Sequence, residues 1–138
     1  MTDPAELRLF AERYAAAWCS QDPARVAAHY APEGSLTING GTPAVERAAI
    51  TEAAHGFMAA LPDIEVVMDD LVVGEGTTEF HWTFTGTNTG PGGTGNAVRV
   101  SGFEEWTITS DGLIADSLGH YDQAEYDRQL EHGVDAGA

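Results

Sequence analysis

Apolar residues in the first sixty positions recur with the spacing of amphipathic helices. Leu7, Phe10, Tyr14 and Trp18 follow one another at steps of three and four residues, which places them on one face of a helix. Asp3-Pro4 supplies an N-cap and a first-turn proline for this helix. The next predicted elements are a short helix after residues 21–23 that carries Val26, His29 and Tyr30, a strand over 35–38, and a helix over 45–61.

After Pro62 the apolar pattern changes from a helical period to the alternation of strands. Ser110-Asp111-Gly112 is a tight-turn signal that joins two of these strands as a hairpin, and the glycine-rich residues 88–95 predict an exposed loop. Asp122 then caps a final helix that runs through Leu130. The predicted strands cover residues 64–73, 77–87, 97–109 and 113–121.

Helices followed by antiparallel strands predict an α+β fold, with about three helices packed on the concave face of a curved, mainly antiparallel sheet. A sheet that curves around helices leaves a cavity at its open end. At 138 residues the chain has the length of one domain, which we assign to residues 1–138 with a frayed tail over 133–138.

Composition limits the expected partners. Six Lys+Arg against 22 Asp+Glu give a formal net charge of -16. Binding to nucleic acid needs a basic patch, and an anionic membrane surface would repel this chain, so we expect neither partner. An uncharged, mostly apolar small molecule is the expected ligand. Cys19 is the only cysteine, which excludes an internal disulfide, and the first residues carry no export signal, so we expect a cytoplasmic protein.

Several motifs of the second half follow the order of a known family. Residues 80–91 read FHWTFTGTNTGP, residues 100–106 read VSGFEEW, residues 111–114 read DGLI, and Tyr121-Asp122 follows. This series resembles the SnoaL-like polyketide cyclases of the nuclear transport factor 2-like superfamily. Upstream positions in family-like order are Trp18, Arg47 with Ala49-Ile50, and Pro62-Asp63. The resemblance implies the cone-shaped fold of that superfamily.

The resemblance also implies chemistry. It suggests a cofactor-free polyketide cyclase, or a related isomerase or dehydratase, that uses acid-base catalysis on an apolar small molecule. The family's acid/base is an aspartate of the final strand, whose place falls on Gly119 in this sequence, so the expected carboxylate is missing. A one-residue bulge could bring His120 into that place. The alternative function is a non-catalytic ligand-binding or dimerisation module on the same fold.

The register expected from the 110–112 turn selects the candidate catalytic residues. A type I turn with a glycine bulge places Gly119 on one sheet face with Phe103 and Glu105. Glu105 is then the candidate acid/base and His81 its proton relay. The alternatives are a solvated Glu105 and an ordinary strand histidine at 81, because parity alone does not say which face His81 occupies. The candidate ligand-binding residues are Tyr14, Trp18, Phe57, Phe103 and Tyr121.

Two further expectations concern metals and assembly. His120 and Asp122 form a His-x-Asp pair, but two ligands do not make a metal site, and we expect no metal or organic cofactor. The same register places four large apolar residues on the outer sheet face, which predicts a homodimer through that face. If the faces are inverted, these residues are instead core beneath the helices. They are Trp106, Ile108, Ile114 and Leu118.

Overall fold

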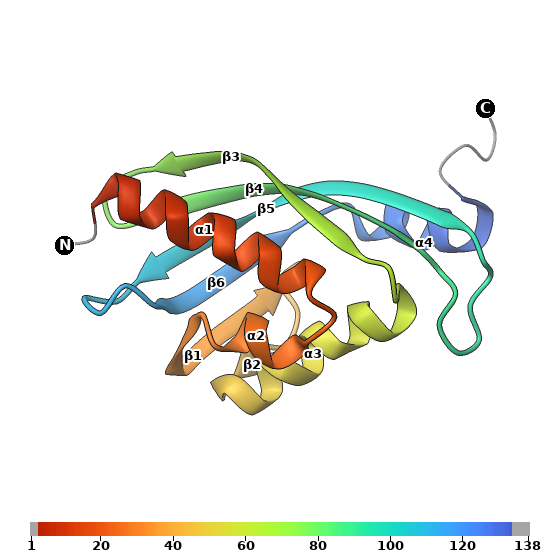
Figure 1. The fold of residues 1–138 in the computed structure, drawn as a ribbon, viewed down its shortest axis with the longest axis horizontal. Helices are drawn as coiled ribbons and strands as arrows, with labels where there is room; N and C mark the ends of the chain where they lie inside the picture. The colour runs from red at the N-terminus through yellow and green to blue at the C-terminus, as the bar shows by residue number, and fades with distance from the viewer. Residues whose placement is uncertain (1–2, 134–138) are drawn as a thin grey trace.

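The computed structural model describes residues 3–133 and shows a curved six-stranded sheet in the order β2-β1-β6-β5-β4-β3 (Figure 1). In Figure 1 the long strands β3, β4 and β5 arch over α1, with α2 and α3 below it. The elements are α1 (Pro4–Cys19), α2 (Pro23–Ala27), β1 (Tyr30–Ile38), β2 (Ala44–Val45), α3 (Glu46–Ala60), β3 (Glu65–Val73), β4 (Thr78–Thr87), β5 (Ala97–Ile108), β6 (Ile114–His120) and α4 (Gln123–His132). The predicted α+β class is confirmed. The tail predicted to fray lies outside the described residues, apart from Gly133.

Strand pairing is mainly antiparallel, as predicted, with one parallel pair between β1 and β6. β1 begins at Tyr30, earlier than predicted, because residues 31–34 continue the strand irregularly instead of breaking the chain. The register against β6 shifts between Tyr30 and Ser35. Gly34 permits the close approach there, since a Cβ would lie 2.8 Å from the carbonyl oxygen of Ile114.

The first helix buries the face that its sequence predicts. Leu7, Tyr14 and Trp18 are buried against the sheet, with Tyr14 fully covered. Pro4 lies in the first turn, where its missing N–H removes no helical hydrogen bond. Asp3 occupies the N-cap position, but its side chain forms no capping hydrogen bond, in contrast to the prediction. Packing of the apolar face therefore stabilises α1 more than its cap does.

The hairpin between β5 and β6 decides which side chains face the helices. Its turn has the predicted form, with the turn glycine at φ 82°. The pair nearest the turn joins Ile108 with Ile114, but the next pair joins Thr107 with Asp116. Ala115 is therefore an extra residue, a β-bulge. Because side chains alternate along a strand, this shift of one residue changes the face of every later residue of β6 relative to β5.

The predicted outer face is wrong for this reason. Trp106 and Ile114 are fully buried beneath the helices, which is the inverted alternative stated above. Ile108 is partly buried and packs against the same core. Leu118 alone of the four lies on the outer face as predicted, and it is 46% exposed.

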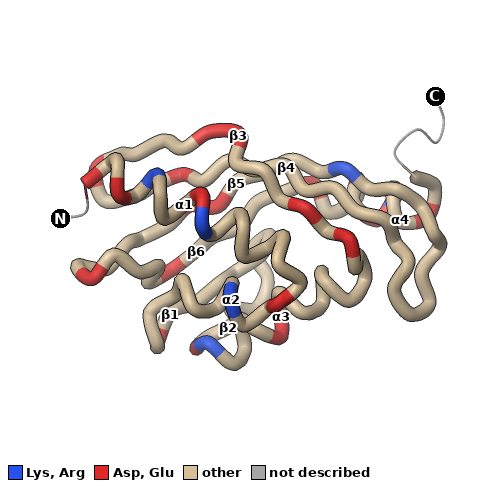
Figure 2. Tube along the Cα trace, viewed as in Figure 1, with Lys and Arg blue, Asp and Glu red and all other residues tan. Residues whose placement is uncertain are grey.

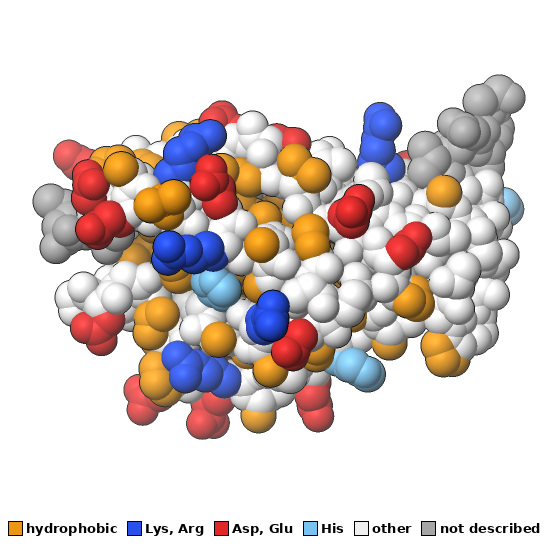
Figure 3. Space-filling model, in the orientation of Figure 1, with side chains coloured by type: hydrophobic (Ala, Val, Ile, Leu, Met, Phe, Trp, Pro, Cys, Tyr) orange, Lys and Arg blue, Asp and Glu red, His pale blue; other side chains and the backbone are white. Residues whose placement is uncertain are grey.

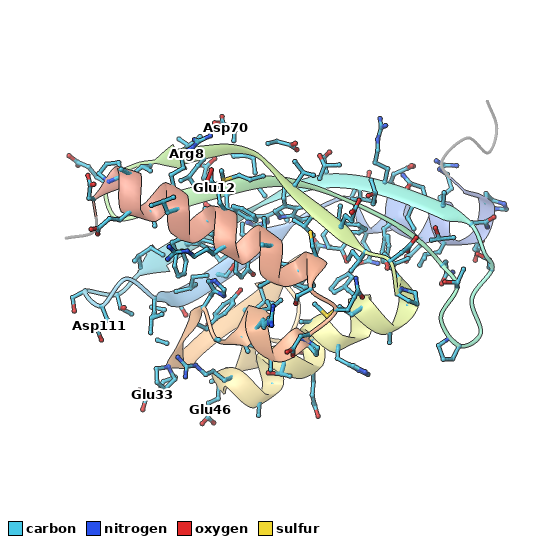
Figure 4. All side chains as sticks on the ribbon, in the orientation of Figure 1. Arg8, Glu12, Glu33, Glu46, Asp70 and Asp111 are labelled. Atoms are coloured by element: carbon cyan, nitrogen blue, oxygen red, sulfur yellow. The ribbon has the colours of Figure 1, made fainter. Side chains whose placement is uncertain are left out.

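Acidic side chains cover the outside of the fold. Figure 2 shows Asp and Glu distributed along helices, strands and loops, and Figure 4 shows Glu33, Glu46, Asp70 and Asp111 pointing away from the molecule. Charged groups stay in water because burial without a partner costs free energy. Glu104 is the one buried carboxylate among the described Asp and Glu residues, with 7% of its surface exposed.

Candidate active site

A cavity of about 50 Å³ lies between the concave face of the sheet and the helices. Its wall is mostly aromatic and aliphatic, with Trp18 from α1, Phe57 from α3 and Trp82 from β4. Glu104 of β5 supplies the only charged side chain among the described residues that line it. One water molecule needs roughly 10–15 Å³ of such a cavity, so this volume holds several waters or one small molecule.

Four of the six arginines lie on helices α1, α2 and α3, and none of the six lines the cavity. Figure 3 shows basic side chains gathered over α1, α2 and α3, whose arginines are Arg8, Arg13, Arg25 and Arg47. None of the described lining residues is basic. An anionic ligand would find no opposite charge in the cavity and would meet Glu104, whereas a neutral ligand meets mainly apolar surface.

Glu104 is held by hydrogen bonds from three elements. Its Oε1 accepts from Ser117 Oγ at 2.7 Å, from Trp106 Nε1 at 2.9 Å and from the Tyr14 hydroxyl at 3.0 Å. Its Oε2 has a longer contact, 3.3 Å, with the same hydroxyl of Tyr14. The hydroxyls of Tyr14 and Tyr30 lie 2.9 Å apart. The three hydrogen bonds to Oε1 therefore hold the carboxyl in place, and Oε2 has only the longer contact with Tyr14.

Burial raises the pKa of Glu104 above its ordinary value of 4.5, while the hydrogen bonds from Trp106, Ser117, Tyr14 and Tyr30 act in the opposite direction. Burial and the nearby carboxylate also raise the pKa of Tyr14 and of Tyr30 well above 10.0, so both remain phenols. The site thus combines a carboxyl that exchanges its proton closer to neutral pH with neutral hydroxyl donors around it.

This raised pKa predicts how stability depends on pH. Between the unfolded pKa, near 4.5, and the higher folded pKa, the unfolded chain binds fewer protons than the folded chain. The contribution of Glu104 to stability is therefore fully present below the unfolded pKa and is lost as pH rises through the folded pKa. Urea unfolding of the wild type and of Glu104→Gln across this range measures the difference. Parallel pH profiles of the two proteins would contradict the raised pKa.

Gly119 lies directly opposite Glu104 on β6 and also lines the cavity. A Cβ placed on Gly119 would meet the Glu104 Cγ at 3.8 Å, which is an ordinary van der Waals contact. The position that the family resemblance gives to a catalytic aspartate is thus at the cavity. The carboxyl of Glu104 enters the same space from the neighbouring strand.

A family model described as "SnoaL-like domain" matches residues 11–117. The chain belongs to the SnoaL-like domain family. No protein with a curated description matches the chain in sequence. The resemblance inferred from residues 80–122 is confirmed.

Solved structures share the SnoaL-like fold at low identity. TsrD from Streptomyces laurentii is 25% identical with a TM-score of 0.80, and the match covers 94% of this chain and 98% of that chain. A putative SnoaL-like polyketide cyclase from Jannaschia sp. CCS1 is 15% identical, with a TM-score of 0.78 and coverage of 94% and 96%. The epoxide hydrolase/cyclase-like enzyme SalBIII is 16% identical, with a TM-score of 0.77 and coverage of 91% and 97%. These likenesses confirm the predicted fold.

Glu105 and His81, the residues predicted to be catalytic, lie outside the cavity. Glu105 Oε2 lies 2.7 Å from His120 Nε2, and His81 Nε2 lies 3.0 Å from Glu79 Oε1, all on the outer sheet face. The ring of Phe103 lies between the two histidines, with ring centroids 5.2 Å from His81 and 4.9 Å from His120. The predicted placement of Glu105 beside Gly119 is wrong because of the bulge in β6. The alternative that moved His120 into the cavity is also wrong, because Gly119 faces the cavity and His120 pairs with Phe103 on the outer face.

The candidate ligand-binding residues divide into three groups. Trp18, Phe57 and Tyr121 line the cavity. Tyr14 is fully buried behind it and reaches it through the hydrogen bond to Glu104. Phe103 lies outside with the histidines, so its predicted position is corrected. The ligand-binding roles of Trp18, Phe57 and Tyr121 stay predictions.

Sequence reasoning placed the wrong glutamate of the pair 104–105 in the cavity. One signal in β5 identifies the right one: Val98, Val100 and Trp106 share a face with Glu104, and the other face carries polar residues such as Arg99. The more apolar face of a half-buried strand is the one that packs on the core. Weighing the whole strand, and not the turn register alone, would have placed Glu104 inside.

In residues 3–133, no group of three or more His, Cys, Asp and Glu side chains is placed to hold a metal ion. Asp122 caps α4, since its Oδ1 accepts from the backbone N–H of Glu125 at 3.1 Å. No helix within this part of the chain has the length and apolarity needed to cross a membrane.

Proposed function

We propose that this SnoaL-like protein is an acid-base enzyme of the cyclase, isomerase or dehydratase type, acting on a small, uncharged and largely apolar molecule. The observation that carries the proposal is the buried carboxyl of Glu104 in the wall of an apolar cavity. A charged group is rarely buried for stability alone, because desolvation opposes it. At such a position a carboxyl whose pKa is raised by burial is typical of a proton-transfer site.

The proposed step moves one proton between carbon and oxygen. Ionised Glu104 accepts a proton from a carbon beside a carbonyl group, which leaves the electron pair shared between that carbon and the carbonyl oxygen as an enolate. Protonated Glu104 then returns the proton to the same or a neighbouring atom. Tyr14, Ser117 and Trp106 hold Oε1 throughout, so Oε2 exchanges the proton. An aldol ring closure and an isomerisation both begin with this step.

Relatives support this class of chemistry without identifying a substrate. The Jannaschia structure is named as a putative SnoaL-like polyketide cyclase, and SalBIII as an epoxide hydrolase/cyclase-like enzyme in pyran ring formation. The small cavity favours a compact ligand, because pockets for drug-sized molecules usually occupy about 300–1,000 Å³. A polyketide would require movement of Phe57 and Tyr121, the partly exposed rings of the lining. The alternative, a non-catalytic ligand-binding module, also uses the cavity, but in it Glu104 transfers no proton.

Exchange of carbon-bound hydrogen tests the proposal without knowledge of the natural substrate. Cyclohexanone is incubated in D₂O with the protein, and ¹H NMR follows the loss of its α-hydrogens. We expect exchange faster than in buffer alone, with a half-maximal rate at a pH above 4.5, because the base is a carboxyl with a raised pKa. Binding of the ketone without faster exchange would support the non-catalytic alternative.

The homodimer stays a prediction with a smaller apolar basis than the sequence suggested. The outer face still carries exposed Leu118 and half-buried Phe103, and Val67 of β3 is 60% exposed. Covering such groups favours association of two sheets. We expect a dimer mass by light scattering at micromolar concentration, and a monomer mass would reject the prediction. The cytoplasmic location and the lack of nucleic-acid and membrane partners also stay predictions.

A further inference from the structure

Trp82 places a buried hydrogen-bond donor without a partner in the wall of the cavity. Its side chain lines the cavity and is 7% exposed. Its Nε1 is the one buried side-chain nitrogen or oxygen in residues 3–133 that has no hydrogen-bond partner. The indole of Trp106, which is also buried, donates to Glu104 at 2.9 Å. Buried donors are nearly always paired, so an unpaired one beside a cavity points to a partner that enters from outside.

The sheet fixes the position of this indole. Trp82 pairs across strands with Gly102, and a Cβ on Gly102 would come within 2.8 Å of the Trp82 Cζ2. The glycine therefore creates the space in which the ring lies over β5. Phe84 stacks on the indole with ring centroids 5.5 Å apart, and Tyr121 meets it at 6.0 Å. These rings limit rotation of the indole toward a protein partner.

The indole of Trp82 and the carboxyl of Glu104 belong to neighbouring rows of cross-strand pairs on the same sheet face. Phe80 pairs with Glu104, and two residues along β4 Trp82 pairs with Gly102. Two residues of a strand span about 7 Å, a distance that one small molecule can bridge. A ligand in the cavity therefore meets Glu104 in one row and the indole in the next. Since the indole N–H can only donate, its partner must be a hydrogen-bond acceptor.

We propose that Trp82 selects ligands with an uncharged oxygen acceptor, the carbonyl of a small ketone being the simplest case, and turns the carbon beside that carbonyl toward Glu104. The Trp82 Nε1–H donates to the carbonyl oxygen. An anionic oxygen is disfavoured because the lining carries Glu104 and no basic side chain among the described residues. The orientation rests on the proposed acid-base function, whereas the selection for an acceptor requires only that the cavity binds the ligand.

Two probes of similar shape test the selection. Cyclohexanone carries the acceptor, and methylenecyclohexane has a CH₂ group in its place. Each is titrated into ¹⁵N-labelled protein, and the indole N–H signals of the three tryptophans are followed. The Trp82 signal is assigned as the one that Trp82→Phe removes. We expect cyclohexanone, and not methylenecyclohexane, to move this proton signal downfield, as formation of a hydrogen bond does.

A matched pair of variants measures the strength of the selection. Trp82→Phe keeps an aromatic ring and removes the donor, so the affinity ratio between ketone and hydrocarbon should fall by roughly three- to tenfold, the value of one neutral hydrogen bond. Phe103→Leu removes a ring from the outer sheet face, away from the cavity, and should leave the ratio unchanged. Because the ratio compares two probes on one protein, a general loosening of the cavity cancels. The thermal stability of Trp82→Phe without probe checks that the variant is folded.

Three outcomes overturn the proposal. A preference for ketone that survives in Trp82→Phe assigns the donor to another group. Equal affinities of the two probes for the wild type show that no donor is available, and binding of neither at millimolar concentration shows that the N–H cannot be reached. Failure of the acid-base proposal is separate, since it appears as absent hydrogen exchange while the ketone preference remains.

Discussion

Glu104→Gln is expected to slow the catalysed exchange of cyclohexanone α-hydrogens by about 10²–10⁴-fold, the usual contribution of a general acid-base group. Glutamine has nearly the same shape as glutamate, and its amide oxygen can accept the hydrogen bonds that Ser117 and Trp106 now donate. It cannot accept a proton from carbon near neutral pH. The lower exchange rate would therefore be caused by the lost proton transfer and not by a change in the structure of the site. ¹H NMR in D₂O measures the rate.

Glu105→Gln is the matched control for this variant. Glu105 is the next residue on the same strand, but its carboxylate lies on the outer face and contacts His120 at 2.7 Å. We expect its exchange rate to stay within about twofold of the wild type, since surface changes away from a site have small effects. A large loss in Glu105→Gln with an active Glu104→Gln would return the catalytic role to the residue first chosen from the sequence.

Gly102→Ala is expected to destabilise the fold by about 3 kcal/mol, at the upper end of the usual cost of overpacking a core. The added Cβ would lie 2.3 Å from the backbone carbonyl oxygen of His120 and 2.8 Å from the indole of Trp82. The carbonyl belongs to the paired strand β6 and cannot move without breaking the ladder. Urea unfolding measures the change.

Gly119→Ala makes the same change directly opposite the buried carboxyl of Glu104, two residue pairs along the ladder from Gly102. Here the nearest atoms lie at 3.8 Å, so the methyl group fits. We expect stability equal to the wild type or greater by about 0.4–1 kcal/mol, because alanine reduces the entropy of the unfolded chain. Equal destabilisation by the two substitutions would contradict the packing described for this face.

The fold could be predicted because its signals are local and repeated. The steps of three and four from Leu7 to Trp18 indicate a helix, and the alternation after Pro62 indicates strands. Their order then determines an α+β arrangement. The parallel pairing of β1 with β6 is set by contacts between segments far apart in the chain, which no local period shows. β2 has only two residues, too few to show a period.

The candidate site was harder to predict because a single residue decides it. The turn at 110–112 has the form expected from its sequence, but nothing in the local composition distinguishes Ala115 as a bulged residue. Ser117 and Gly119 were therefore paired one residue out of register. That error exchanged Glu105 for Glu104 as the buried carboxyl.

The bulge at Ala115 also decides which residues of β6 face the cavity. If Ala115 paired within the ladder and no residue bulged, Leu118 would lie opposite Glu104 and His120 opposite Gly102. A substitution changes one side chain, whereas this change of register exchanges every later residue of β6 between the two sheet faces. In evolution, loss of the bulge at constant hairpin length is thus a single step from one cavity chemistry to another on the same backbone architecture.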